Sequence, residues 1–250
     1  MKLACASSAF ALAISGGALT QLEWLDLCAR RLQVDGVVCD VAHFPRRDGD
    51  YLAQIKKMAA DLGLSIGAVW DEGFFGADEA AMQESLALCD AIGSPLLCAP
   101  LGCETTRSWT AQLQSLSNAT SLAKTINVTL AVRNAPNTFA ATAHDLRRVS
   151  KETDSAWLRY ALEIDALDAA SDPQLLTGKT VMLWHEHSEG QTEDAEGAPN
   201  VRTLRAAENF CGFLTLDTKD GSATQETMLD GVRAWRTMLA QEVLGRSVGA

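Results

Sequence analysis

The sequence predicts a single-domain α/β protein, a (β/α)8 TIM barrel that spans residues 1–250. Short apolar runs recur about every 30 residues along the chain, which is the spacing of successive strand–helix units. Amphipathic segments separate these runs, and no linker-like stretch divides the chain into halves. A doubly wound open sheet is the alternative, but it usually contains fewer repeats.

Each apolar run is short and bounded by polar or turn-forming residues, as expected of buried parallel strands. The predicted strands are 2–6, 36–40, 65–70, 95–99, 128–133, 158–163, 180–184 and 213–216.

The segments between the strands carry apolar residues at helical spacing. The predicted helices are 21–32, 49–62, 78–92, 106–126, 142–152, 204–210 and 225–244. Thr20 and Thr142 are the predicted N-caps of two of them, because a hydroxyl can accept a hydrogen bond from the first helical turn. Gly63 and Gly93 are predicted to stop two others. The acidic, glycine-rich segment 190–200 is predicted to be a mobile loop.

The composition suits a protein with a large buried core, since 47% of the residues are hydrophobic and 21% are charged. The net charge of -11 argues against nucleic acid or an anionic membrane as partner. No apolar run is long enough to span a bilayer. Seven scattered cysteines without a CxxC pair predict buried free thiols in a reducing cytoplasm.

The apolar stretch that follows Lys2 is not expected to be an export signal, because such a signal needs a longer charged start and this stretch supplies the first strand. The expected location is therefore the cytoplasm. A homo-oligomer is compatible with the sequence, because helix faces that pair between barrels look like ordinary amphipathic helices.

Polar side chains follow the last four predicted strands. Arg133 and Asn134 end the fifth strand, Glu163 ends the sixth, a His-Glu-His triplet (185–187) follows the seventh, and Asp217 follows the eighth. The carboxyl ends of barrel strands converge on one mouth, where small-molecule sites form. The sequence therefore predicts a site for a small-molecule substrate or ligand at this mouth.

Short motifs around several predicted strands add a family resemblance. These are LQVDGV at 32–37, HFP at 43–45, LGLSI at 62–66, AIGSP at 91–95 and GF at 212–213. In this order and spacing, over nearly the whole chain, the sequence resembles the xylose-isomerase-like TIM barrels. That family contains sugar and sugar-phosphate isomerases and epimerases as well as endonuclease IV.

The resemblance implies a divalent metal (Mn, Mg or Zn) held by Glu, Asp, His and Glu on strands five to eight. Matched position by position, Glu163, His185 and Asp217 are the implied metal ligands, with Asp165 and His187 as alternatives. Glu163 and Asp217 are also implied catalytic residues, because the carboxylates in this family move protons beside a polarised carbonyl. Arg133 stands where the strand-five Glu belongs.

A cation at a ligand position leaves three interpretations of Arg133 open. Its guanidinium could occupy the metal position and pair with Glu163 and Asp217, since a planar fork of donors suits two carboxylates. It could instead bind a carboxylate or phosphate of the substrate, or tilt out of the mouth into a surface ion pair. If the guanidinium fills the position, no metal cofactor is expected.

Other polar or aromatic residues near strand ends are candidate substrate-binding groups. His43 could reach a hydroxyl and Trp70 could stack on a sugar ring. Asn134, His187 and Lys219 complete the predicted substrate-binding set. Glu104, after the fourth strand, is an alternative proton carrier.

Two functional hypotheses follow. The first is a sugar (phosphate) isomerase- or epimerase-like enzyme with a degenerate metal site, acting on a small polyhydroxylated or carbonyl compound. The second is a non-catalytic, metal-free barrel that binds or senses a small molecule, with Arg133 in place of the metal. Fold alone does not decide between them.

Overall fold

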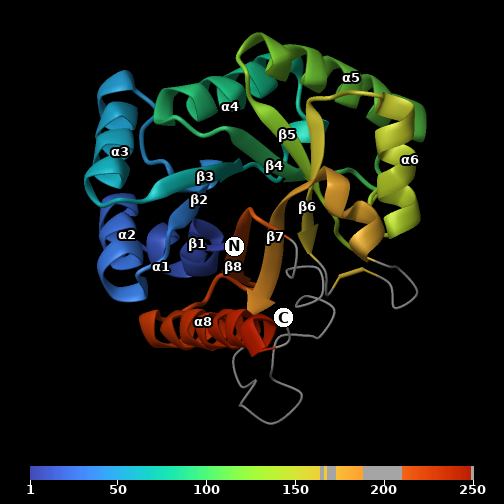
Figure 1. Ribbon diagram of the computed structural model, residues 1–250. Helices are drawn as coiled ribbons and strands as arrows, with labels where there is room; N and C mark the ends of the chain where they lie inside the picture. Colours follow the sequence, from blue (N-terminus) through green and yellow to red (C-terminus); the bar gives the residue numbers. More distant parts are fainter. Residues whose placement is uncertain (164–165, 168–172, 188–209, 249–250) are drawn as a thin grey trace.

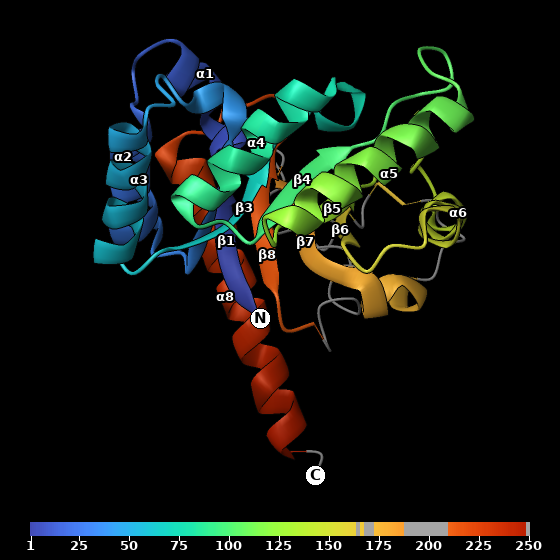
Figure 2. The ribbon, with the colours of Figure 1, turned by 90° about the horizontal axis from the view of Figure 1, so that it is seen from above.

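The computed structural model describes residues 1–163, 166–167, 173–187 and 210–248. Parallel strands β1 to β8 close into a barrel in chain order, which confirms the predicted TIM barrel. Figure 1 shows the helices arranged as a ring around the strands. Figure 2 shows β1 running from the N-terminus toward the end of the barrel where α1 lies.

The strands are β1 (Lys2–Ala6), β2 (Gly36–Asp40), β3 (Ser65–Trp70), β4 (Leu96–Pro100), β5 (Thr129–Arg133), β6 (Leu158–Glu163), β7 (Thr180–His187) and β8 (Phe213–Thr218). The α-helices are α1 (Ala11–Ser15), α2 (Gln21–Leu27), α3 (Gly49–Asp61), α4 (Glu79–Ile92), α5 (Trp109–Thr125), α6 (Ala143–Thr153) and α8 (Gln225–Val248). Short turns of tighter or wider helix include η1 (Ser7–Phe10), η2 (Cys28–Leu32), η3 (Val41–His43) and η5 (Pro173–Lys179).

The predicted strand positions are correct to within one residue at each end, except that two strands extend further at their carboxyl ends. β7 continues to His187 and β8 to Thr218, because the two strands pair with each other up to these residues. The helix predicted over 21–32 is α2 followed by the π-helical turn η2. The predicted caps Thr20 and Thr142 both form capping boxes. The predicted loop 190–200 and nearly all of the predicted helix 204–210 lie outside the described residues.

Alternate residues of each strand face the barrel interior and the helices. The interior contains a separate cluster of buried side chains: Ala6, Val38, Ala68, Cys98, Ala131, Ala161, Met182 and Trp184. A second and larger cluster lies between the barrel and its helices. It contains the strand residues that alternate with the interior ones, such as Leu183 and Leu216. This parity decides which polar residues at the strand ends enter the mouth.

Phe213 closes the amino-terminal end of the barrel interior. A Cβ atom added to Gly36 would lie 2.6 Å from Cε1 of the Phe213 ring and 2.8 Å from the carbonyl oxygen of Ser65. Only glycine therefore fits at this position of β2 beside the ring.

Five of the seven cysteines are buried free thiols, as predicted, but Cys103 is half-buried and Cys211 is exposed. Among the described helices, none has the length and apolar character needed to cross a membrane.

Candidate functional site

The barrel parity directs a specific set of side chains into the carboxyl-terminal mouth. Arg133, Glu163 and Glu186 each lie two residues beyond an interior residue of the same strand: Ala131, Ala161 and Trp184. Asp217 has the same parity as Phe213, which packs against the interior cluster. Asp40 and Trp70 reach the mouth from β2 and β3 in the same way.

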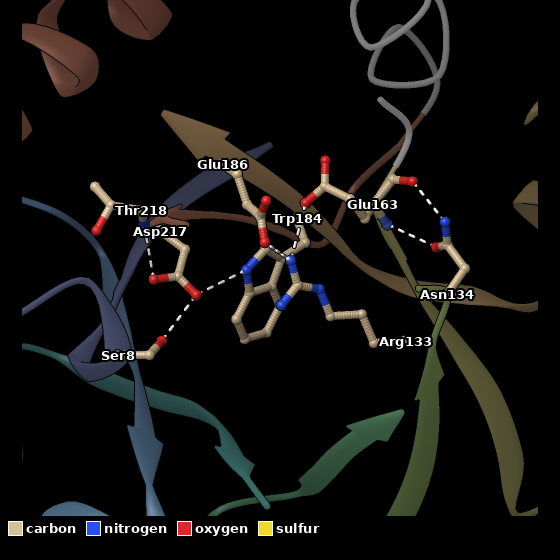
Figure 3. A network of polar contacts seen from close by, with 8 residues as sticks. All are labelled: Ser8, Arg133, Asn134, Glu163, Trp184, Glu186, Asp217 and Thr218. Carbon is tan, nitrogen blue, oxygen red and sulfur yellow. Dashed lines mark hydrogen bonds and ion pairs between the residues drawn. The ribbon is translucent and has the colours of Figure 1, made fainter. Parts of the chain in front are cut away.

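Arg133 lies inside the mouth, in contact with two carboxylates and two aromatic rings. Figure 3 shows it with Glu163, Glu186 and the ring of Trp184. Its Nη2 donates to Glu186 Oε1 at 2.7 Å and to Glu163 Oε2 at 3.2 Å. The guanidinium carbon lies 4.5 Å from the ring centroid of Trp184 and 5.3 Å from that of Trp70. Only 12% of the Arg133 side chain is exposed, so these contacts hold the charge in a largely desolvated position.

This geometry corrects two of the interpretations of Arg133. The residue does not tilt out to the surface, and its second carboxylate partner is Glu186 instead of Asp217. Asp217 interacts with the guanidinium only through its charge, which lowers the pKa of Asp217 against the dominant effect of burial. The reason is that the Trp184 ring lies between the two, with the guanidinium over its face and its Nε1 donating to Asp217.

Asp217 is a buried carboxylate held by three donors. Its Oδ2 accepts hydrogen bonds from Ser8 Oγ at 2.8 Å and from Trp184 Nε1 at 3.1 Å. Its Oδ1 accepts one from the Thr218 N–H at 2.8 Å. Burial raises the pKa of Asp217, while the Arg133 charge and these hydrogen bonds oppose that rise. The residue is 3% exposed, so its carboxylate is enclosed by protein.

His185, the predicted metal ligand on strand seven, does not face the mouth. It points outward from β7, and its ring lies 5.5 Å from the Trp235 ring on α8. The prediction was wrong because Trp184 fills the interior, which directs the next residue to the helical layer. The side chain of His187 and all of Asp165 lie outside the described residues.

Two predicted substrate-binding residues have other positions. Asn134 is buried and pairs with the backbone of Glu163: its Nδ2 donates to the carbonyl oxygen at 2.7 Å, and its Oδ1 accepts from the N–H at 2.8 Å. It joins the ends of β5 and β6 instead of facing a ligand. Lys219 is exposed in the turn after β8 and makes no hydrogen bond or ion pair with the described residues.

His43 and Asp40 connect the ends of β1 and β2. The Nδ1 of His43 lies 2.8 Å from Ser7 Oγ, and that oxygen accepts the Asp40 N–H at 2.9 Å. Burial lowers the pKa of His43. Burial raises the pKa of Asp40 to about 6; the Ala42 N–H opposes this rise, and the neighbouring carboxylates Asp71 and Glu72 add to it.

Asp40 should make the protein lose stability as the pH rises from about 4 to about 6. Its pKa is higher in the folded state than in the unfolded chain, where the usual value is 3.8. The stabilisation is therefore complete below this window and is lost as the folded-state proton dissociates within it. The Asp40→Asn variant should lack this loss, which we expect to be about 1–2 kcal/mol after discounting for partial exposure. Urea titrations at pH 4 and pH 6.5 check it; equal pH dependence in both proteins would contradict the assignment.

Three residues of the mouth were not predicted from the sequence. Trp184 was counted only as part of an apolar run, Glu186 only as the residue between two histidines, and Ser8 was not considered. Strand parity places Glu186 on the same face as Trp184 and Met182, but the sequence does not show that this face is the interior one. Ser8 gave no signal, since it meets Asp217 only when β8 closes against β1.

Gly221 allows this closure to be tight. It has a positive φ of 68°, and an added Cβ would lie 2.8 Å from the Cβ of Ala11 and 3.0 Å from the carbonyl oxygen of Ser8. A side chain there would push the segment after β1 away from the segment after β8. The position of Ser8 beneath Asp217 therefore depends on a glycine in another loop.

The site has the composition of a charge-paired cluster and not of a metal centre. Among residues 1–163, 166–167, 173–187 and 210–248, no three His, Cys, Asp or Glu side chains are grouped as metal ligands. The position between Glu163 and Glu186 holds the guanidinium of Arg133. A divalent cation would have to displace that group, so the implied metal does not fit these residues.

The chain has the fold of the xylose-isomerase-like TIM barrels. It superimposes on an L-ribulose 3-epimerase with a TM-score of 0.75 and 15% identity, covering 100% of this chain and 98% of that chain. On the probable 3-DHS dehydratase AsbF of Bacillus anthracis it superimposes with a TM-score of 0.74 and 12% identity, covering 94% of this chain and 99% of that chain. On the IOLI protein, whose structure contains a zinc atom, the TM-score is 0.71 and the identity 14%, covering 97% of this chain and 98% of that chain. No family model and no curated protein matches the sequence.

Proposed function

We propose that this protein is a sugar isomerase- or epimerase-like barrel that binds a small polyhydroxylated or carbonyl compound at its carboxyl-terminal mouth without a metal. Arg133 takes the position and the positive charge that the metal has in such barrels. The observation that carries the proposal is the guanidinium held between Glu163 and Glu186 against two indole rings.

Binding is favoured over catalysis because of where the predicted proton carriers lie. Asp217 is enclosed and already accepts three hydrogen bonds. The Glu163 side chain is 5% exposed and paired with Arg133. A carboxylate must contact the reacting carbon to move its proton, and neither of these is exposed to a ligand that enters from the mouth. The half-buried ring of Trp70 is available as an apolar wall for such a ligand.

Replacing Arg133 with glutamate should create a metal site. The new carboxylate would join Glu163 and Glu186, and three carboxylates suit Mn²⁺ or Mg²⁺. We expect Arg133→Glu to bind about one Mn²⁺ per chain in isothermal titration. The unmodified protein should contain no stoichiometric Mn, Zn or Mg by elemental analysis.

The control is Arg233→Glu, which makes the same change of charge at an exposed position on α8. It should bind no Mn²⁺. A stoichiometric ion in the unmodified protein would contradict the replacement of the metal by Arg133.

A further inference from the structure

Of the three carboxylates around Arg133 and Trp184, which are Glu163, Glu186 and Asp217, Glu186 is the one that a ligand can reach. Its side chain is 34% exposed, against 5% for Glu163, and Asp217 is 3% exposed. Its Oε1 accepts from Arg133 Nη2 at 2.7 Å. Among the described residues, no donor binds the second oxygen. Arg133 thus fixes the carboxylate in place and leaves one oxygen for another donor.

A fixed carboxylate oxygen selects the chemistry of its partner. An ionised carboxylate only accepts hydrogen bonds, so it binds a hydroxyl and repels a phosphate or a second carboxylate. Arg133 does not reverse this preference, because its single positive charge is outnumbered by the two carboxylates that its Nη2 binds, Glu163 and Glu186. The same pairing argues against the interpretation of Arg133 as a receptor for a substrate phosphate.

We propose that Glu186 accepts a hydrogen bond from a ligand hydroxyl, and that the mouth therefore takes a hydroxylated, unphosphorylated end of its ligand. This inference rests on the proposed function and adds to it the residue that contacts the ligand and the charge class of the ligand. Trp70 lies close enough to report on binding, since its ring centroid is 5.3 Å from the guanidinium carbon of Arg133, the residue that pairs with Glu186.

The experiment follows the indole N–H resonance of Trp70, identified by its loss in Trp70→Phe, in ¹⁵N–¹H spectra. The probes are D-fructose, D-ribulose, glycerol and inorganic phosphate. In the unmodified protein we expect at least one of the three polyhydroxylated compounds to shift the resonance and phosphate to leave it unchanged. Glu186→Gln should weaken that binding at least about tenfold, because a charged acceptor is lost. Glu186→Lys should bind phosphate.

Glu84→Gln, on the exposed face of α4, is the matched control and should behave as the unmodified protein. Equal affinity of Glu186→Gln and the unmodified protein for a polyhydroxylated probe would overturn the role of Glu186 and leave the proposed function standing. Phosphate binding that is the same in the unmodified protein and in Glu186→Lys would also overturn it. No response to any of the three polyhydroxylated compounds would count against the proposed function, while the phosphate arm still tests Glu186.

Discussion

Replacing Arg133 with methionine should destabilise the protein by about 3 kcal/mol. Methionine fills similar space but leaves Glu163 buried without the cation that Arg133 supplies. It also removes the guanidinium from the faces of Trp70 and Trp184, a contact worth about 2 kcal/mol when desolvated. The expected loss of unfolding free energy is at the lower end of the range for removing one partner of a buried ion pair, because one-third of the Glu186 side chain is exposed. Urea titration measures the free energy of unfolding.

Two further variants separate charge from packing. Arg233→Met removes an arginine from an exposed pair on α8, with 68% and 64% of the two side chains exposed, and should change the stability by less than about 0.5 kcal/mol. The triple variant Arg133→Met, Glu163→Gln, Glu186→Gln removes both carboxylate charges along with the cation. It should recover most of the lost stability, because no unpaired charge is left buried. Full stability of Arg133→Met alone would show that the guanidinium is not holding the mouth together.

The second large effect concerns the indole N–H of Trp184. Trp184→Phe keeps an aromatic face for Arg133 but removes one of the three donors to the buried carboxylate of Asp217. A hydrogen bond to a charged group contributes about 1.5–3 kcal/mol. The variant should therefore lose about 2 kcal/mol beyond the cost of the smaller ring.

The chain offers a matched control for ring size. Trp235 is also fully buried, and its Nε1 has no hydrogen-bond partner among the described residues. Trp235→Phe thus removes the same atoms without removing a hydrogen bond. The difference in unfolding free energy between the two variants isolates the contact with Asp217, and equal losses would show that this contact contributes nothing.

The pH dependence gives a second test of the same contact. Burial raises the pKa of Asp217 above its usual 3.8, and the Trp184 N–H opposes that rise. Trp184→Phe should raise the pKa further, so the folded state holds the proton more tightly and the extra loss of stability appears only as the pH rises above about 4. Below that pH the carboxyl is protonated in both the folded and the unfolded state. The difference between Trp184→Phe and Trp235→Phe should then fall to the smaller contribution of a hydrogen bond to a neutral group. Asp217→Asn should abolish the pH dependence of this difference.

The order of elements was predictable because each rule that sets it is local. Strand runs, helical spacing, the caps Thr20 and Thr142 and the repeat of about 30 residues are all properties of neighbouring residues. Repeated strand–helix units have few ways to close, so the barrel and the location of its mouth follow from them. Arg133, Glu163 and Asp217 were placed at the mouth for the same reason.

The facing of β7 was not predictable from its sequence. Val181, Met182, Leu183 and Trp184 are all apolar, because a parallel barrel strand is covered by the interior on one face and by helices on the other. No alternation of polar and apolar residues shows which face is which. His185 was therefore assigned to the mouth, although the closed barrel directs it toward α8 and turns Glu186 inward.

The sequence by itself determined the fold, the end of the barrel that carries the site, and the presence of a cation among acids at that end. Only the tertiary structure decided which acids meet that cation. Arg133 and Glu186 come from strands that are 53 residues apart in the chain, and Ser8 and Asp217 are 209 residues apart. Such contacts depend on the register and closure of the whole barrel, and no local pattern of residues specifies them.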